Sequence, residues 1–300
     1  MSSPKRVSLA YIAETLSLSK TTVSWVLSGQ GDCRGINANT QKRVLEFAAK
    51  CDYRPSYLAQ SLSTGRTRTF GLIVSSLADP FYSHLSMEMV ASAEAQGYTV
   101  YITTSETNEK MEDQLIGQFV DRGVEGVIIT PAGVESAGIE RVLGKTSIVL
   151  ADRKVPGLAA SSVVADNEDS AYRLVSHLIG KGNRKIALMT TLHRIDNLSD
   201  RCNGYRRAMA EAGYDVPDSL ICKIDKTASR EEIFERLGLL FEQHPDVDGI
   251  FFTTHVFVVP TYAFYRKMGK KINGGANWAC IHSLPEFEFI VPQMSIAQLP

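Results

Sequence analysis

The feature that most restricts the fold is the alternation of short apolar runs with amphipathic stretches from Phe70 to Ile281. Continuous apolar runs are typical of parallel strands covered on both faces, and the stretches between them have the helical period. The expected strands lie near Gly71–Val74, Val100–Thr103, Gly126–Thr130, Ser147–Leu150, Val163–Ala165, Lys185–Met189, Ser219–Lys223, Gly249–Thr253 and Trp278–Ile281. The expected helices lie near 81–96, 109–122, 135–143, 168–181, 200–212, 230–243 and 257–268.

This alternation falls into two series, which predicts an α/β body of two lobes with parallel, doubly wound sheets. We expect the body to span residues 67–300, with a first lobe at about 67–160 and a second at about 161–292. Residues 293–300 are expected to begin a return to the first lobe. Ligands of such sheets bind beyond the carboxyl ends of the strands, so the predicted ligand site is the cleft between the lobes.

The first 70 residues differ in charge from the rest. They contain ten Lys and Arg and four Asp and Glu, a net charge of +6, whereas the whole chain has −1 and the remainder therefore −7. A basic head on an acidic body indicates that the head alone meets a polyanion.

The head contains a tight helix–turn–helix pattern. Residues 9–16 form an apolar helix face, Ser17-Leu18 a short turn, and Ser19 can cap a second helix through residue 28. In that second helix an apolar stripe opposes a face with hydroxyls, one cation and Trp25, and no carboxylate. Such a face suits phosphates and base edges, although an ordinary surface helix would share part of the pattern. A third helix is expected at about 40–51, completing a domain at 1–54.

Residues 55–66 are predicted to be a hinge helix or linker. Pro55 suits a first helical turn and Gly65 a helix end. Two turns are marginal alone in water, so this helix should be ordered by a partner. Ala59 and Leu62 would form a wedge able to open a minor-groove step, and a plain linker is the alternative.

Motifs of catalysis and metal binding are absent. The five cysteines are scattered without a Cys-x-x-Cys, and there is no His-Glu-x-x-His, Gly-x-Ser-x-Gly or P-loop. We therefore expect no enzyme, no cofactor and no metal site. No apolar run approaches the roughly 18 residues that span a membrane, and no signal segment is evident, so a cytoplasmic protein is expected. From the body alone, a periplasmic-type solute binder without DNA regulation is the alternative.

Taken together, these motifs resemble the lactose-repressor family of transcription regulators, and within it the fructose and sucrose repressor branch. The residues that carry the resemblance are Ile12-Ala13, Ser19-x-x-Thr22-Val23-Ser24, Thr40-x-x-Arg43-Val44, Tyr53-x-Pro55, Ala59-x-x-Leu62, Gly71-Leu-Ile-Val, Gly65-Arg-Thr-Arg-Thr69 and Phe252-Thr-Thr254. The resemblance implies an all-α helix–turn–helix domain and a periplasmic-binding-protein-like body. It also implies a cytoplasmic repressor of carbohydrate genes that acts as a homodimer or a tetramer on a pseudo-palindromic double-stranded DNA operator.

The resemblance also assigns DNA contacts. Lys20, Thr21 and Trp25 are placed to read bases, and Trp25 stands where many relatives carry Arg, which favours an apolar contact such as a thymine methyl. Leu62 would be the wedge. The remaining expected DNA-binding residues, several of them at phosphate-contacting positions of the family, are Ser8, Ser19, Thr22, Ser24, Ser28, Asn37, Thr40, Tyr53, Ser56 and Ala59.

The strand ends carry hydroxyls, carboxylates, an Arg and aromatic rings, which suit a sugar or sugar-phosphate effector. The expected effector-binding residues are Ser76, Asp79, Phe81, Thr130, Asp152, Arg201, His255 and His282. Tyr82, Arg153 and Thr254 also stand at strand ends. In the family, the Arg of Arg201-x-x-Gly204-Tyr205 binds sugar oxygens or an anion; a structural ion pair is the alternative.

Two histidines depart from the family pattern. His282 stands where an Asp is usual, and His255 belongs to a Thr-His pair where Asn-Asp is common. The pair would favour a phosphate or make binding depend on pH; drift in loops or loss of sugar binding is the other interpretation. The chain also stops before the helix and strand that follow Pro292 in the family, so we expect a C-terminal truncation.

Overall fold

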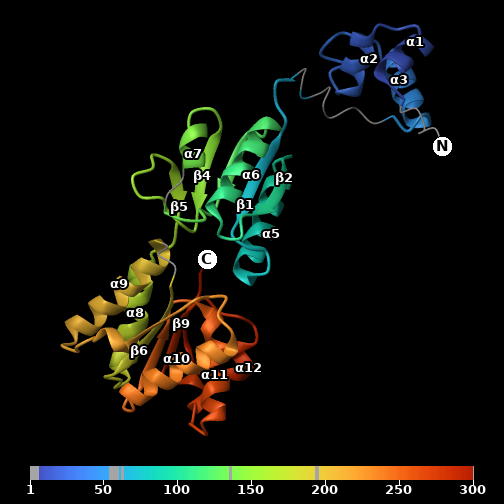
Figure 1. Ribbon diagram of the computed structural model, residues 1–300. Helices are drawn as coiled ribbons and strands as arrows, with labels where there is room; N and C mark the ends of the chain where they lie inside the picture. Colours follow the sequence, from blue (N-terminus) through green and yellow to red (C-terminus); the bar gives the residue numbers. More distant parts are fainter. Residues whose placement is uncertain (1–6, 54–60, 62–63, 135–136, 193–195, 300) are drawn as a thin grey trace. The chain divides into compact units, whose positions relative to one another are not determined.

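The computed structural model describes residues 7–53, 61, 64–134, 137–192 and 196–299 (Figure 1). The chain divides into two compact units, Met1–Thr67 and Arg68–Pro300. The predicted hinge residues Ser56, Ala59 and Leu62 lie outside the described residues, so the helix expected there stays a prediction.

The described residues of the first unit form three short helices, α1 (Leu9–Thr15), α2 (Lys20–Leu27) and α3 (Ala38–Lys50). Their apolar faces meet in one small core, in which Ile12, Val23 and Val44 are fully buried. Each helix begins at a side-chain cap: Ser8 accepts from the Tyr11 amide, Ser19 from the Thr22 amide and Asn37 from the Thr40 amide. These caps satisfy amides that have no partner inside the helix. They explain why helices of this length start where they do.

The first sheet of the second unit has the order β2-β1-β3-β4-β5, with all neighbours parallel. Alternate residues of β1 face opposite sides: Ile73 packs with α6 and α7, whereas Leu72 and Val74 pack with α5. The elements of this lobe are β1 (Thr69–Val74), α5 (Pro80–Glu94), β2 (Thr99–Thr104), α6 (Glu109–Asp121), β3 (Gly126–Ile129), α7 (Ala137–Val142), β4 (Ser147–Ala151) and β5 (Ser161–Val163).

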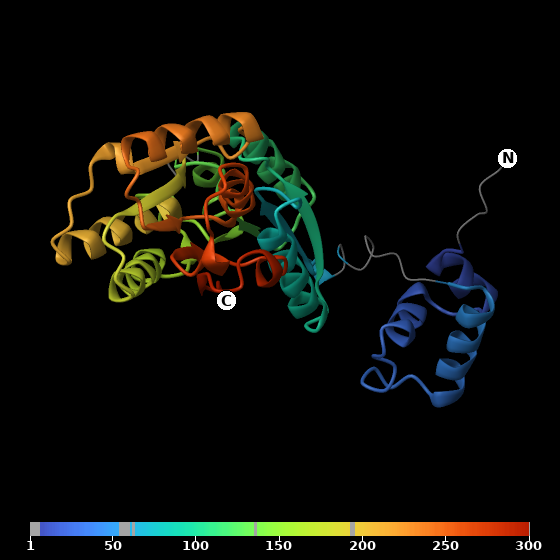
Figure 2. The ribbon, with the colours of Figure 1, turned by 90° about the horizontal axis from the view of Figure 1, so that it is seen from below.

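The second sheet has the order β10-β9-β8-β6-β7. Read from β7, its second, first, third, fourth and fifth strands follow one another, which is the order found in the first sheet. The core of the second sheet lies on two faces: Ala187 and Met189 of β6 pack with α10 and α11, and Ile186 and Leu188 pack with α8 and α9. Helices accordingly flank this sheet on both sides (Figure 2). The elements are α8 (Asn167–Gly180), β6 (Ile186–Thr191), α9 (Asp196–Glu211), η1 (Asp218–Leu220), β7 (Ile221–Ile224), α10 (Arg230–Gln243), β8 (Gly249–Phe252), η2 (His255–Phe257), α11 (Val258–Lys267), η3 (Asn273–Gly275), β9 (Trp278–Ile281), α12 (Phe287–Ile290) and β10 (Ser295–Ala297).

Two expected boundaries are wrong. The strand expected at Val163–Ala165 at the start of the second lobe is β5, at 161–163, and its Val163 pairs with Ala151 of β4 in the first sheet. Residues 293–300 were expected to return to the first lobe, but β10 pairs with β9 in the second sheet. Both are three-residue strands at sheet edges, and a run of residues does not reveal which sheet edge it will pair with. No helix in the described ranges is both long and apolar enough to cross a membrane.

Candidate functional site

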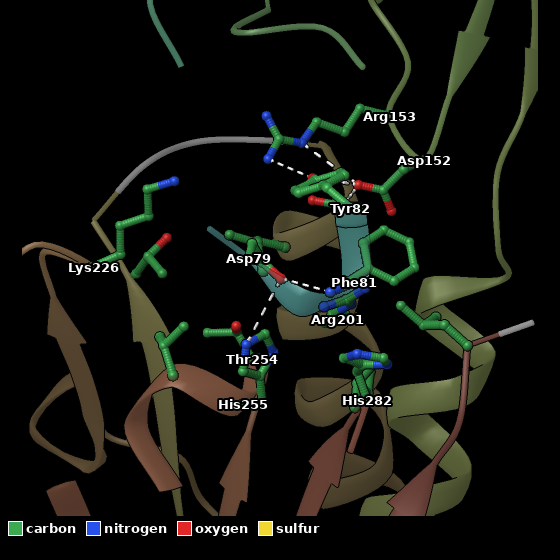
Figure 3. Close-up of a pocket in the computed structure, with 16 residues that line it drawn as sticks. Asp79, Phe81, Tyr82, Asp152, Arg153, Arg201, Lys226, Thr254, His255 and His282 are labelled. Carbon is green, nitrogen blue, oxygen red and sulfur yellow. Dashed lines mark hydrogen bonds and ion pairs between the residues drawn. The ribbon is translucent and has the colours of Figure 1, made fainter. Parts of the chain in front are cut away.

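A cavity of about 90 Å³ lies between the carboxyl ends of the two sheets (Figure 3). This volume leaves room for several water molecules. The first sheet supplies residues that follow β1 and β4, and the second supplies residues that follow β6, β7, β8 and β9. The lining residues are Asp79, Phe81, Tyr82, Asp152, Arg153, Thr191, Asn197, Leu198, Arg201, Lys226, Thr254, His255, Val256, Ile281, His282 and Leu299.

One wall is a hydrogen-bonded triad from the first lobe. The Tyr82 hydroxyl donates to Oδ2 of Asp152 at 2.8 Å and accepts from Nη2 of Arg153 at 2.8 Å. Nη1 of Arg153 donates to the Pro131 carbonyl at 2.9 Å, and its Nε lies 3.7 Å from the Asp152 carboxylate. Burial is the main cause that raises the pKa of Tyr82, so this hydroxyl keeps its proton at neutral pH. The triad therefore presents a fixed array of charged and polar groups to the cavity.

Direct contacts cross the cleft. Nδ2 of Asn197 donates to Asp152 Oδ2 at 3.1 Å, and Nε2 of His255 lies 3.9 Å from Asp79 Oδ1. At the edge, Lys226 Nζ donates to the Thr107 hydroxyl at 3.3 Å. Burial lowers the pKa of Lys226. These contacts tie the lobes in this arrangement, and a molecule entering the cavity would exchange some of them for its own.

Aromatic rings extend from the triad across the cleft, beginning with Phe81, whose ring centroid is 5.0 Å from that of Tyr82. Phe81 packs edge-on against His282, with centroids 5.3 Å apart, and His282 is 5.4 Å from His255. Asp152 and His282 share a left-handed backbone, with φ of 65° and 71°. Each is the first residue after a corresponding strand, β4 or β9. Such backbone is uncommon for residues other than glycine and concentrates at functional sites.

Arg201 projects from α9 and is only 5% exposed. Its Nε donates to Asn167 Oδ1 at 2.8 Å and its Nη1 to the Thr253 carbonyl at 2.7 Å. Arg201 forms no direct ion pair with a carboxylate in the described part of the chain, although the charge of Asp152 acts to raise its pKa. Gly204 makes this placement possible, because a Cβ there would lie 2.2 Å from the Glu168 carbonyl and hold α9 away from α8. Burial lowers the Arg201 pKa, yet a guanidinium remains charged at neutral pH.

Burial favours the neutral form of both cavity histidines. Burial lowers the pKa of His282 to about 4, with a further contribution from His255. Burial also lowers the pKa of His255, although Asp79 opposes that effect. A neutral imidazole can still donate a hydrogen bond to a phosphate. The lowered pKa values disfavour a positive charge on either histidine near neutral pH.

The cavity brings together six of the eight expected effector-binding residues: Asp79, Phe81, Asp152, Arg201, His255 and His282. Ser76 and Thr130 do not line it. Ser76 accepts from the Ala78 amide at 3.4 Å, and Thr130 is fully buried, with no hydrogen-bond partner for its hydroxyl among the described residues. Sequence reasoning missed Asn197 and Lys226. The strand-end rule could have found Lys226, which follows β7, whereas Asn197 is the second residue of α9, the helix that follows β6.

A second candidate surface is α2 in the head. Val23 and Val26 are buried, whereas Lys20, Thr21 and Ser24 are exposed. Several expected DNA-binding residues also make local hydrogen bonds: Ser19 and Thr22 hydroxyls are 2.8 Å apart, and Ser28 donates to the Trp25 carbonyl at 3.1 Å. Thr40 and Tyr53 are half-buried, Tyr53 against the head core, and Trp25 is half-buried beneath Arg34.

No group of three or more His, Cys, Asp or Glu side chains within the described ranges is arranged to hold a metal ion. Among the described carboxyl groups, Glu112 is the most buried, at 1% exposed, and it accepts from the Ala132 amide at 2.7 Å. Burial raises its pKa to about 7. Its single strong contact is to backbone at the end of β3, which gives it a structural role in holding that segment.

Known proteins resemble this chain over most of its length. Catabolite control protein A of Priestia megaterium is 30% identical over 223 residues, which are 74% of this chain and 66% of that protein. The sucrose operon repressor of Klebsiella pneumoniae is 27% identical over 209 residues, 70% of this chain and 63% of that protein. The chain thus spans slightly less than two thirds of the length of these relatives.

Among solved structures, the lac repressor dimer bound to operator and the anti-inducer ONPF has the same fold, with a TM-score of 0.84 at 17% identity, covering 98% of this chain and 88% of that one. The predicted fold class, a helix–turn–helix head with two lobes of parallel sheets, is confirmed. The profile of periplasmic binding proteins and sugar binding domain of the LacI family matches residues 67–287. Because that match takes in most of the chain, this protein belongs to the LacI family, as the sequence motifs predicted.

Proposed function

We propose that the protein is a sequence-specific, DNA-binding transcriptional repressor of carbohydrate-metabolism genes, controlled by a sugar or sugar-phosphate effector. The observation that carries this proposal is the surface of α2. Its apolar side is buried in the head core, while a side with Lys20, Thr21 and Ser24 and without any carboxylate is exposed. Such a helix can enter the major groove without repelling phosphates.

The helix starts support phosphate contacts beside that helix. α2 and α3 begin at Ser19 and Asn37, and the first turns of both helices lack acidic residues. The amino end of a helix offers free amides and a partial positive charge to an anion. Ser19, Thr22, Asn37 and Thr40 therefore remain proposed phosphate contacts, and their caps keep them at the amino ends of α2 and α3.

The cavity chemistry supports an oxygen-rich effector that carries negative charge. Arg153, Arg201 and Lys226 outnumber the carboxylates Asp79 and Asp152, and burial favours the neutral form of the histidines. Carboxylates accept from sugar hydroxyls, guanidinium groups bind phosphate, and Phe81 offers an apolar face. Binding would replace contacts that cross the cleft and so change the angle between the lobes. The names of the two relatives, a catabolite control protein and a sucrose operon repressor, agree with this effector class.

The test is DNA binding by the full chain. Wild-type protein is expected to shift a fragment of its own upstream region, with affinity that falls steeply as salt rises. Lys20→Ala should reduce binding to the selected site, whereas Lys110→Ala, which removes a charge from an exposed position of α6, should not. No shift with any upstream fragment at low salt, together with retained binding of hexose phosphates, would establish a solute binder instead.

A further inference from the structure

The connection between α2 and α3 is tied down rather than loose. The Gln30 amide donates to the Trp25 carbonyl at 2.8 Å, and the Ile36 amide donates to the Gly31 carbonyl at 3.0 Å. Nε2 of Gln41 reaches back from α3 to Asp32 Oδ1 and to the Ile36 carbonyl, both at 2.8 Å. Gly31 is buried against Gln41, where a Cβ would lie 2.4 Å from that side chain. The loop therefore has a defined conformation before any partner binds.

This conformation places Arg34 over Trp25. The Cζ of Arg34 lies 4.9 Å from the centroid of the indole ring, and Arg34 is exposed. The nearest carboxylate in sequence, Asp32, is occupied by Gln41. Among the described residues, Arg34 makes no ion pair, so its charge is free to meet another anion.

Trp25 belongs to the same exposed side of α2 as Thr21 and Ser24. A guanidinium stacked on that ring adds five N–H donors next to them, and stacking covers only the flat faces of the group. The donors lie in the plane of the guanidinium, so they remain available. Stacking on an aromatic ring also fixes the plane in advance, which lowers the entropy lost on binding.

We propose that Arg34 is a base-reading residue, which stacks on Trp25 and donates to the major-groove edge of a guanine beside α2. This inference rests on the proposed DNA-binding function. The proposed role of Trp25 therefore differs from the apolar base contact expected from the sequence, because its ring supports the Arg34 guanidinium instead. The occupant is duplex DNA, as the charge of the head indicates. Arginine is the side chain that best matches the O6 and N7 acceptors of guanine.

The experiment is selection of bound sites from random double-stranded DNA with full-length wild type, Arg34→Ala, Arg34→Lys and Lys50→Ala. Wild type should select a guanine at one position in each half-site. Arg34→Ala should lose that preference and bind the wild-type site about tenfold to hundredfold more weakly. Arg34→Lys should also lose much of the preference while keeping the salt dependence. Lys50→Ala, an equal loss of charge at the end of α3, should keep the guanine.

The role of the ring is tested by a double-mutant cycle. If Trp25 supports Arg34, adding Arg34→Ala to Trp25→Leu should weaken binding far less than Arg34→Ala does alone, and Trp25→Phe should keep part of the guanine preference. Circular dichroism of each variant checks that the head is folded.

Two outcomes would overturn the proposal while leaving the DNA-binding function intact. One is an Arg34→Ala site identical to the wild-type site with unchanged affinity. The other is a uniform loss on all sequences with a salt slope reduced by about one, which identifies a phosphate contact. Failure of the wild type to bind any DNA would instead overturn the proposed function itself.

Discussion

Arg201 illustrates how a single residue is prepared for a ligand at this site. Two of its nitrogens already donate to Asn167 and Thr253, so the guanidinium is fixed in orientation at the wall of the cavity. A buried cation without a directly paired carboxylate is costly, and an anionic ligand would add to the favourable charge of Asp152. This arrangement predicts that the residue matters for the effector more than for DNA.

We therefore expect Arg201→Lys to weaken binding of hexose phosphates by about tenfold to hundredfold, because a planar fork of donors is replaced by a point charge. Operator binding without effector should be unchanged. Isothermal titration calorimetry with a panel of hexose phosphates measures the first quantity, and a gel shift the second. Arg206→Lys is the matched control, since Arg206 lies on the same helix but is exposed. Equal affinities in wild type and Arg201→Lys would contradict the assignment.

His282 gives a prediction about pH. Its pKa is lowered to about 4 in the folded chain, mainly by burial, whereas an unfolded chain takes up the proton near pH 6.5. Between these values the unfolded state holds more protons, so the free energy of unfolding falls as the pH falls from about 6.5 towards 4. The stabilisation is complete above pH 6.5.

His282→Asn should remove this part of the pH dependence, on the order of 1 kcal/mol once solvent in the cleft is considered. Urea unfolding of both proteins at pH 7.0, 5.5 and 4.5 is the measurement, and the difference between them isolates His282 from the carboxylates. Curves that stay parallel over this range would show that the histidine has an ordinary pKa in the folded chain.

The limits of sequence prediction at this scale have a physical cause. The strand-end rule identified Asp79, Asp152 and His282 because each follows a strand at the cleft. Thr130 also follows a strand, yet Arg153 reaches across to the neighbouring Pro131 carbonyl and covers the end of β3. Asn197 stands near the start of α9, and its contact with Asp152 of the other lobe depends on tertiary packing. Neither effect can be read from the residues near Thr130 or Asn197.

Among the elements, α2 is the helix in which one residue, Ser19, has two roles. Ser19 caps the helix, and the same hydroxyl is a proposed phosphate contact. Asp also caps helices well, and its charge is favourable at the amino end of the helix but unfavourable near phosphate.

Ser19→Asp should therefore keep the stability of the head while lowering DNA affinity at least tenfold. Ser19→Ala should lose about 1 kcal/mol of stability as well as affinity. Thermal unfolding followed by circular dichroism and fluorescence anisotropy with labelled operator separate the two effects. If Ser19→Asp binds DNA like the wild type, the residue is a cap only. Ser229→Asp, at the capping box of α10 in the body, is the control for the same substitution.

Most helices and strands were predictable because the spacing of apolar residues and the positions of capping residues indicate the same elements. The second helix begins at the predicted Ser19 cap, and α10 spans the expected 230–243. The errors concern β5 and β10. All three residues of β5 are exposed, so no burial pattern identifies its partner, and only pairing with β4 defines it as a strand. Edge strands of this length are decided by tertiary structure.

At the scale of the whole molecule, the body repeats one sheet order in both lobes, and the cleft contacts join the two repeats. One surface of the first lobe is incompletely covered. α5 buries only Tyr82 and Ser86, while its Met87 is 68% exposed. The neighbouring β2 is an edge strand with Tyr101 exposed. An apolar helix beside an open strand edge is a common site of association.

The resemblance described above predicts a homodimer, and this surface is our candidate for its interface, so we expect Met87→Glu to yield monomers at micromolar concentration. A charge buried in an apolar interface without a partner is strongly unfavourable. Operator affinity should then fall by about a hundredfold or more, because two linked heads no longer bind two half-sites together. Analytical ultracentrifugation and anisotropy measure the two quantities. Met268→Glu changes a methionine of the second lobe that is 57% exposed, and this variant should remain dimeric and bind DNA normally. A dimeric Met87→Glu variant would place the interface elsewhere, and a monomeric variant with full operator affinity would show that one head suffices.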